Sequence, residues 1–194
     1  MLPILVTCRT RLTNVKGKVN LNQSLKFGLI KMGFNGVALT SWRDWNVWNL
    51  LGEMQVNGSV EFGTGSRLFI GKNGILRIGN NFLLTAKSDI ICCKRVNFGD
   101  DCLLSWDVLI MDTDSHPIRN ENNEIINYDE PIVIGNNVWI GSRTIILKGA
   151  RIPDNCLIAS GSIVNKEFKI NNSIIAGNPS KIVKQKIIWH KESF

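Results

Sequence analysis

The sequence predicts an all-β solenoid, a single domain in which short strands wind into stacked coils. Two observations predict this fold. An aliphatic residue recurs at every sixth position in two long tracts, and a small or turn-forming residue follows many of these positions. A period of six fits neither an amphipathic helix nor an alternating strand. It suits a flat face that carries one strand and one corner, so that three faces make a coil of about 18 residues.

The clearer tract lies in the C-terminal half, and an earlier one repeats its period. Each recurring aliphatic residue is expected to point inward and to stack on its copy in the next coil. A shift of two residues within the earlier tract, between Val96 and Phe98, predicts a small adjustment at a corner. The repeated positions are Ile134, Ile140, Ile146, Ile152, Ile158 and Val164 in the later tract, and Ile78, Leu84, Ile90, Val96, Phe98, Leu104 and Ile110 in the earlier one.

Three segments depart from this rhythm within the single domain 1–194. Residues 112–130 are polar and rich in Asn, which predicts a loop that leaves the coil. Residues 1–60 carry strand-like stretches without the period and are expected to form irregular N-terminal coils. Residues 178–194 change composition after Gly177 and are expected to leave the coil and pack across it as a C-terminal extension.

Composition limits the class of protein. A hydrophobic content of 44% is ordinary for a globular domain, and no apolar run approaches the roughly 18 residues of a membrane helix. Five cysteines without CxxC spacing favour reduced thiols, and the short apolar N-terminus is a poor signal peptide, so we expect a cytoplasmic protein. The net charge of +7 indicates an anionic partner, either a phosphorylated cofactor or an acidic glycan. No nucleic-acid-binding motif is present, which argues against DNA or RNA.

Four phrases resemble a known family. They are LSWD at 104–107, MDTDSHP at 111–117, PIVIGNNVWIG at 131–141 and IIAGNPSKIVK at 174–184. In combination they resemble the hexapeptide-repeat acyltransferases, in particular the maltose/galactoside acetyltransferase branch and the O-acetyltransferases of polysaccharide loci. The resemblance implies a left-handed parallel β-helix, acetyl-CoA as co-substrate and a sugar hydroxyl as acceptor. It also implies a homotrimer with active sites at the subunit interfaces.

The resemblance places the catalytic base at His116, within the segment 112–130. Histidine suits this role because its free pKa of about 6.5 lies near working pH. An acidic neighbour is expected to orient the imidazole, and Asp114 is preferred slightly over Asp112. The only other histidine is His190, so a zinc site with three histidine ligands is disfavoured and no metal is expected.

The resemblance also implies which residues contact coenzyme A. Gly141 is expected to let the pantetheine arm approach, the amide near Ser142 to stabilise the oxyanion, and Trp139 to shape the pocket. Asn165 stands where relatives often have Thr, which puts a hydroxyl contact there in doubt. The remaining positions that match coenzyme contacts are Ala159, Ser160, Lys166 and Lys181, and the two lysines are candidates for the phosphates.

Three functions are open at this point. The first is O-acetylation of a sugar hydroxyl, in a bacterial surface polysaccharide or its precursor, by direct attack in a ternary complex. No Ser or Cys occupies an activating motif beside His116, so a covalent acyl-enzyme is not expected. The second is N-acylation of an amino-sugar nucleotide or transfer of another acyl group. The third is a β-helix scaffold without activity.

Overall fold

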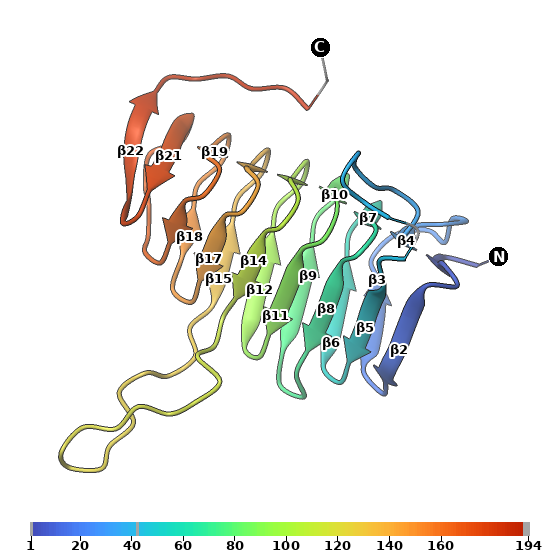
Figure 1. Cartoon of the computed structure of the whole chain (residues 1–194), viewed down its shortest axis with the longest axis horizontal. Coiled ribbons are helices and arrows are strands. Elements are labelled where there is room, and N and C mark those ends of the chain that lie inside the picture. Colours follow the sequence, from blue (N-terminus) through green and yellow to red (C-terminus); the bar gives the residue numbers. More distant parts are fainter. Residues whose placement is uncertain (1, 42, 192–194) are drawn as a thin grey trace.

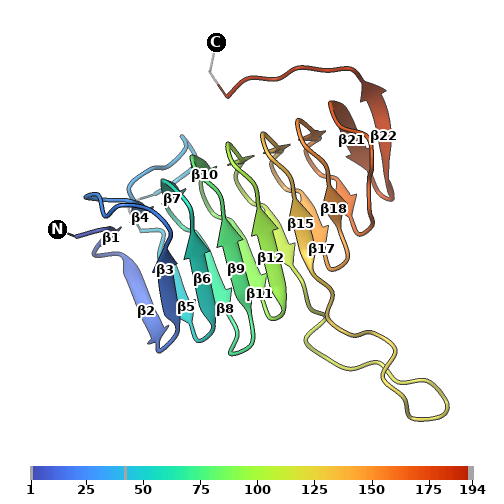
Figure 2. The same cartoon turned by 180° about the vertical axis from the view of Figure 1, so that it is seen from behind.

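The protein is a three-sided prism of short parallel strands, and the computed structural model describes residues 2–41 and 43–191 (Figures 1 and 2). No helix occurs in these residues. Sheet A contains β1 (Ile4–Val6), β4 (Ile30–Met32), β7 (Val60–Phe62), β10 (Phe82–Leu84), β13 (Leu103–Leu104), β16 (Trp139–Ile140), β19 (Leu157–Ile158), β21 (Ser173–Gly177) and β22 (Ser180–Gln185). Sheet B contains β2 (Thr10–Val15), β5 (Asn46–Leu50), β8 (Arg67–Ile70), β11 (Asp89–Cys92), β14 (Leu109–Met111), β17 (Ile145–Leu147) and β20 (Ile163–Val164). Sheet C contains β3 (Lys18–Leu21), β6 (Glu53–Val56), β9 (Ile75–Ile78), β12 (Arg95–Phe98), β15 (Ile132–Ile134) and β18 (Arg151–Ile152).

The core is a set of columns that run along the inside of the prism. Every repeated aliphatic or aromatic position named above is buried, which confirms that these side chains point inward. The columns form because each strand pairs in parallel with the equivalent strand of the next coil, as Leu104 does with Ile140. Phe82 stands between Phe62 and Phe98 in an aromatic stack with ring centroids 5.8 and 4.9 Å apart. Each coil therefore buries its apolar side chains against its neighbours.

The coils differ in length along the prism. Near the C-terminal end, the equivalent residues Asn137 and Asn155 are 18 positions apart, the spacing expected from the repeat. In the middle, the equivalent residues Asn81 and Asp101 are 20 positions apart. The strands stay in register, so the additional length lies in a corner, between β11 and β12. The shift seen in the sequence is therefore a longer corner, as expected.

Short polar residues turn one of the corners. At the corner between sheets C and A, Asn81, Asp101 and Asn137 all adopt the left-handed backbone conformation, with φ between 51° and 59°. Asn and Asp tolerate this conformation better than most side chains. Their side chains also bridge successive coils, since the Asn81 amide donates to the Asp101 carboxylate at 2.7 Å.

The other two corners carry the candidate site. We call the corner between sheets A and B the serine edge, after Ser142 and Ser160, which lie on it in successive coils. We call the corner between sheets B and C the loop edge, because the excursion loop between Met111 and Ile132 leaves the prism there (Figure 1).

The segment 1–60 is more regular than the sequence suggests. Its described part contributes β1 to β6, and these strands extend all three sheets in parallel register. The irregularity lies in the connections, above all the insertion between β4 and β5, and in a register shift between Leu12 and Asn14. The repeat is hidden in the sequence because these insertions interrupt its spacing.

The C-terminal extension crosses sheet A. β22 turns back to pair antiparallel with β21, and residues 186–191 then run over the outside of the sheet toward the N-terminal coils (Figure 1). Trp189 is only 7% exposed, and its indole N–H donates to the Asn137 carbonyl at 2.8 Å. Farther along, the Lys191 ammonium donates to the Asn81 carbonyl at 2.7 Å. We call residues 186–191 the C-terminal strap.

Within the described part of the chain, no helix is both long enough and apolar enough to cross a membrane. All five cysteines are free, and Cys92, Cys102 and Cys156 are buried. Burial raises the pKa of the Cys102 thiol to about 12, so this thiol stays protonated and packs as a small apolar side chain.

Candidate functional site

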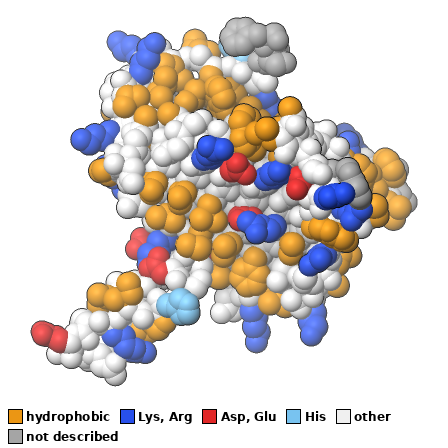
Figure 3. Space-filling view, in the orientation of Figure 1, with side chains coloured by type: hydrophobic (Ala, Val, Ile, Leu, Met, Phe, Trp, Pro, Cys, Tyr) orange, Lys and Arg blue, Asp and Glu red, His pale blue; other side chains and the backbone are white. Residues whose placement is uncertain are grey.

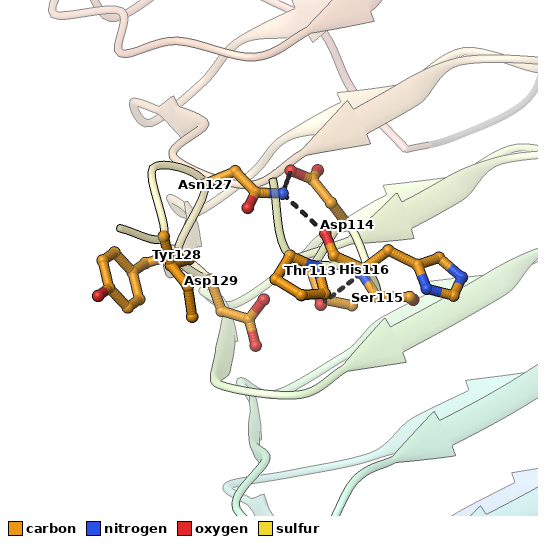
Figure 4. Close-up of a pocket in the computed structure, with 9 residues that line it drawn as sticks. Thr113, Asp114, Ser115, His116, Asn127, Tyr128 and Asp129 are labelled. Atoms are coloured by element: carbon orange, nitrogen blue, oxygen red, sulfur yellow. Dashed lines mark hydrogen bonds between the residues drawn. The ribbon is translucent and has the colours of Figure 1, made fainter. Parts of the chain in front are cut away.

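His116 lies at the base of the excursion loop, on the wall of a pocket of about 230 Å³ (Figure 4). Thr113, Asn127, Tyr128 and Asp129 also line this pocket. Ser115, just before the histidine, has the left-handed conformation with φ of 61°, and its amide donates to the Thr113 hydroxyl at 2.9 Å. The imidazole is exposed and points away from the loop's own hydrogen bonds, so it is accessible to a substrate.

Asp114 anchors the loop and does not contact the imidazole. Its carboxylate accepts hydrogen bonds from the Lys148 ammonium at 2.5 Å and from the Asn127 amide at 2.8 Å. The bond with Lys148, followed by that with Asn127, lowers the pKa of Asp114. The Asn127 amide also reaches the His116 carbonyl at 2.9 Å, so the two arms of the loop are joined beside the histidine. The expected direct contact of Asp114 with the ring is not present in this chain, because Lys148 holds the carboxylate.

The buried carboxylate of Asp112 binds backbone amides of a neighbouring corner. Asp112 is fully buried, and its carboxylate accepts hydrogen bonds from the backbone amides of Cys93, Lys94 and Arg95 at 2.6 to 2.9 Å. These bonds close the neighbouring corner of the loop edge, from which the excursion departs. The Asp112 carboxylate is therefore already occupied by these amides, and in this chain neither acid contacts the imidazole of His116.

The serine edge carries Gly141, Ser142, Ala159 and Ser160. A Cβ on Gly141 would lie 2.7 Å from the Ser160 amide nitrogen and 2.8 Å from the Ile158 carbonyl oxygen. The missing side chain thus allows the next coil to pack closely. This reason for a glycine at position 141 could not be inferred from the sequence. The amides of Gly141 and Arg143 donate to backbone carbonyls, whereas no acceptor for the Ser142 amide occurs among the described residues. Lys181 lies near this edge, since its strand begins just after the turn at Gly177.

Trp139 lies on the outer face of sheet A. Its indole N–H donates to the Ser105 hydroxyl at 3.1 Å, and its ring lies 5.8 Å from the ring of Trp189 in the C-terminal strap. In this chain, Trp139 therefore packs beneath the strap.

Asn165 and Lys166 belong to the loop edge. They share a groove of about 510 Å³ with Asp114, Glu130 and Lys148. The structure thus divides the expected site residues between two edges of sheet B. His116, Asp114, Asn165 and Lys166 lie on one edge, and Gly141, Ser142, Ala159, Ser160 and Lys181 lie on the other.

Lys148, Asn127 and Trp189 were not identified from the sequence. Lys148 and Asp114 are 34 positions apart, and only the folding of the coil brings them together. No metal-binding cluster of His, Cys, Asp or Glu occurs in the described residues.

Comparisons with known proteins agree with this architecture. The family described as bacterial transferase hexapeptide (six repeats) matches residues 131–166. Galactoside O-acetyltransferase of Escherichia coli K12 is 38% identical over 133 residues, which cover 67% of this chain and 60% of that enzyme. An uncharacterised 24.8 kDa protein from the cps region of Klebsiella pneumoniae is 31% identical and covers 96% of this chain and 81% of its own length.

Solved structures show the same fold. The polySia-specific acetyltransferase NeuO aligns with 98% of this chain and 86% of its own, at 25% identity and a TM-score of 0.55. A galactoside acetyltransferase in complex with coenzyme A aligns with 62% of this chain and 59% of its own, at 36% identity and a TM-score of 0.53.

The chain spans only 42 to 60% of the length of three curated galactoside and polysialic acid O-acetyltransferases that it matches. The repeat, the three parallel sheets and the relatives nevertheless agree, and the fold is the left-handed parallel β-helix that the sequence led us to expect. The chain therefore belongs to the family of hexapeptide-repeat acyltransferases.

Proposed function

We propose that this protein is an O-acetyltransferase that moves the acetyl group of acetyl-CoA to a sugar hydroxyl, with His116 as the general base. The observation that carries this proposal is the position of His116. It is an exposed imidazole on the excursion loop, next to a pocket and a short distance along the loop edge from Asn165 and Lys166.

In the proposed reaction, the His116 imidazole takes the proton of the acceptor hydroxyl as its oxygen attacks the thioester carbonyl. A new carbon–oxygen bond forms, and the carbon–sulfur bond breaks as the intermediate collapses. The imidazolium then returns the proton to the departing thiolate, so the products are the acetyl ester and the free thiol. The Ser142 amide, which donates to no acceptor in the described residues, is the proposed donor to the oxyanion.

Acetyl-CoA as donor is supported by the relatives and by charge. A galactoside acetyltransferase at 36% identity was solved with coenzyme A. Lys166 lines the groove at the loop edge and is the proposed contact for a phosphate of the coenzyme, since Lys148 in the same groove is paired with Asp114. Lys181 supplies a second cation near the serine edge.

We further propose a homotrimer whose active sites are shared between chains. The two halves of the site lie on opposite edges of sheet B, so one chain does not bring them together. Three prisms in a closed ring, with sheet B toward the axis, would make the loop edge of each chain face the serine edge of the next across a groove that the substrates enter.

The outer face of sheet B supports this arrangement. Figure 3 shows hydrophobic side chains gathered on one face of the prism, with a few charged side chains among them. On sheet B, Arg67 and Asp89 of neighbouring strands form an ion pair. The outward apolar residues are Val47, Phe69, Ile91, Leu109, Met111, Ile145, Leu147 and Ile163, and all of them are half-buried in the single chain.

The proposed acceptor is a bacterial surface polysaccharide or its precursor, because several relatives act on galactosides or polysialic acid. The proposed location is the cytoplasm, where acetyl-CoA is made and where five free thiols remain reduced.

Replacement of His116 tests the proposal. We expect His116→Ala to lower turnover by about 10²- to 10⁴-fold, the usual contribution of a general base. Turnover is measured as thiol release from acetyl-CoA with a panel of galactosides and acidic glycans. Mass spectrometry and cleavage by mild base identify the product as an ester, because an amide would survive that treatment.

The other histidine provides a matched control. His190 is exposed on the C-terminal strap, away from the loop edge, so His190→Ala should retain wild-type turnover. Turnover that is nearly normal in His116→Ala, or lost equally in both variants, would refute the role of His116. Absence of any affinity for acetyl-CoA in calorimetry would instead favour a scaffold without activity.

A further inference from the structure

Basic side chains line the loop edge on the N-terminal side of the excursion loop. Lys16 and Lys18 lie at its first corner, Lys72 at the third, and Lys94 and Arg95 at the fourth. All five residues are exposed, and we call them the basic row. Figure 3 shows basic side chains that project from the lower edge of the prism, the edge from which the loop also departs.

A groove of about 350 Å³ lies within this row, lined by Lys16, Lys18 and Lys72. Part of its lining is bare backbone, because Gly17, Gly52 and Gly74 lie at these corners. A Cβ on Gly52 would lie 2.3 Å from the carbonyl oxygens of both Gly71 and Gly74, so only glycine lets the coils meet so closely. The result is a shallow trough along the edge with cations on its walls.

The three lysines of this groove form no ion pair in the described residues. Glu53 also lines the groove, and its carboxylate accepts hydrogen bonds from the amides of Asn20 and Gln55, both at 2.6 Å. The lining therefore carries three ammonium groups and one carboxylate, which leaves an excess of positive charge. A bound polyanion would neutralise this excess charge along the row.

We infer that the basic row binds an acidic polysaccharide and leads it to His116, an inference that rests on the proposed acetyl transfer to a sugar. From the corner of Lys16 to that of Asp112 there are four coil steps of about 4.8 Å, or about 19 Å in all. This length matches an extended run of several sugar rings. Lys148 and Lys166 lie on the other side of the loop. Acceptor and coenzyme thus reach His116 from opposite ends of one edge.

The lining favours a glycan over a nucleic acid. Single-stranded nucleic acids are held by aromatic side chains on which the bases stack. The groove has no aromatic lining residue. Beside glycine backbone and the aliphatic Leu51 and Ile75, it presents three lysines and the polar side chains of Glu53 and Asn73. Carboxylated sugars need such cations and hydrogen-bonding groups, and they have no bases to stack.

A binding experiment without acetyl-CoA tests this inference independently of turnover. Fluorescence anisotropy measures the dissociation constant of labelled oligosialic acid, short and long, at low and physiological ionic strength. We expect the long oligomer to bind more tightly than the short one and to weaken with salt. The double variant Lys16→Glu/Lys72→Glu should bind it at least about tenfold more weakly.

The control double variant is Lys26→Glu/Lys184→Glu, which makes the same change in net charge at exposed positions outside the row. It should change the dissociation constant less than about twofold, since surface charges beyond a Debye length are screened. The inference is wrong if both double variants lose affinity equally, if the wild type does not bind, or if RNA of equal charge binds more tightly. Because the binding experiment contains no acetyl-CoA, a failure of transfer and a failure of the basic row are read separately.

Discussion

At the residue scale, the ion pair of Asp114 with Lys148 holds the loop that carries His116. The carboxylate bonds Lys148 and Asn127, and Asn127 reaches the His116 carbonyl. We therefore propose that Asp114 is a positioning residue that acts on the histidine through the backbone. This role differs from that of a triad acid, which bonds the imidazole and stabilises its charge.

A double-mutant cycle separates these roles. We expect Asp114→Asn and Lys148→Met each to lower turnover by about ten- to hundredfold, because a misplaced base loses near-attack geometry. The double variant should be little worse than either single one, since both break the same contact. Turnover is measured from pH 6 to 8, where the lowered pKa of Asp114 keeps the carboxylate charged and the pair intact.

The opposite result would assign Asp114 to the imidazole. In that case Asp114→Asn would cost far more than Lys148→Met and would also shift the pH profile of turnover. Effects that add in the double variant would likewise contradict a shared contact.

At the scale of elements, the C-terminal strap binds the last coils to earlier ones. Trp189 packs on Trp139, and Lys191 reaches Asn81, which lies two coils before Trp139. A solenoid has contacts only between adjacent coils, so its end coils can separate easily. The strap adds contacts across several coils of sheet A and opposes this separation.

Substitution of the strap tryptophan should show this contribution. Trp189→Ala removes a ring that is only 7% exposed together with its hydrogen bond to Asn137, and should lower the free energy of unfolding by about 3 kcal/mol. The adjacent Ile188 is 80% exposed, so Ile188→Ala should stay within about 0.5 kcal/mol of the wild type. Urea denaturation followed by intrinsic fluorescence and circular dichroism measures both. Equal stability of the two variants would show that the strap does not dock.

At the scale of the whole molecule, we propose that the two edges of sheet B carry complementary halves of one site. His116 lies on the loop edge, and Ser142 and Ala159 lie on the serine edge. In the proposed ring, each site takes one half from each of two chains. Two variants that are inactive alone should therefore restore activity when they are mixed.

Complementation tests this arrangement. Ala159→Glu should block the serine edge by placing a charge against the coenzyme, while His116→Ala removes the base. Equal co-expression of both chains should recover about a quarter of wild-type turnover, because one in four interfaces pairs the two intact halves. Light scattering of the wild type should give three times the mass of one chain. A monomer, or no recovery with both chains folded, would contradict the shared site.

The sequence by itself determined the solenoid and the place of the histidine. The six-residue period of the tract 134–164 predicts columns of inward-pointing side chains. Each face of a coil buries one such side chain, and this holds for any conformation of the corners. The polar run 112–130 predicts the excursion loop, and its only histidine is His116. These features are local in the chain, so a pattern of residue types reveals them.

Only the tertiary structure decided which residues meet across coils. Three contacts join residues that are far apart in the chain. They are the pairing of Asp114 with Lys148, the hydrogen bond of the Arg95 amide to the Asp112 carboxylate, and the packing of Trp189 on Trp139. These separations depend on corner length and on the path of the strap, and no local pattern encodes either. The same holds for the coils of the segment 1–60, where insertions hide the repeat, and for the division of the site between the two edges of sheet B.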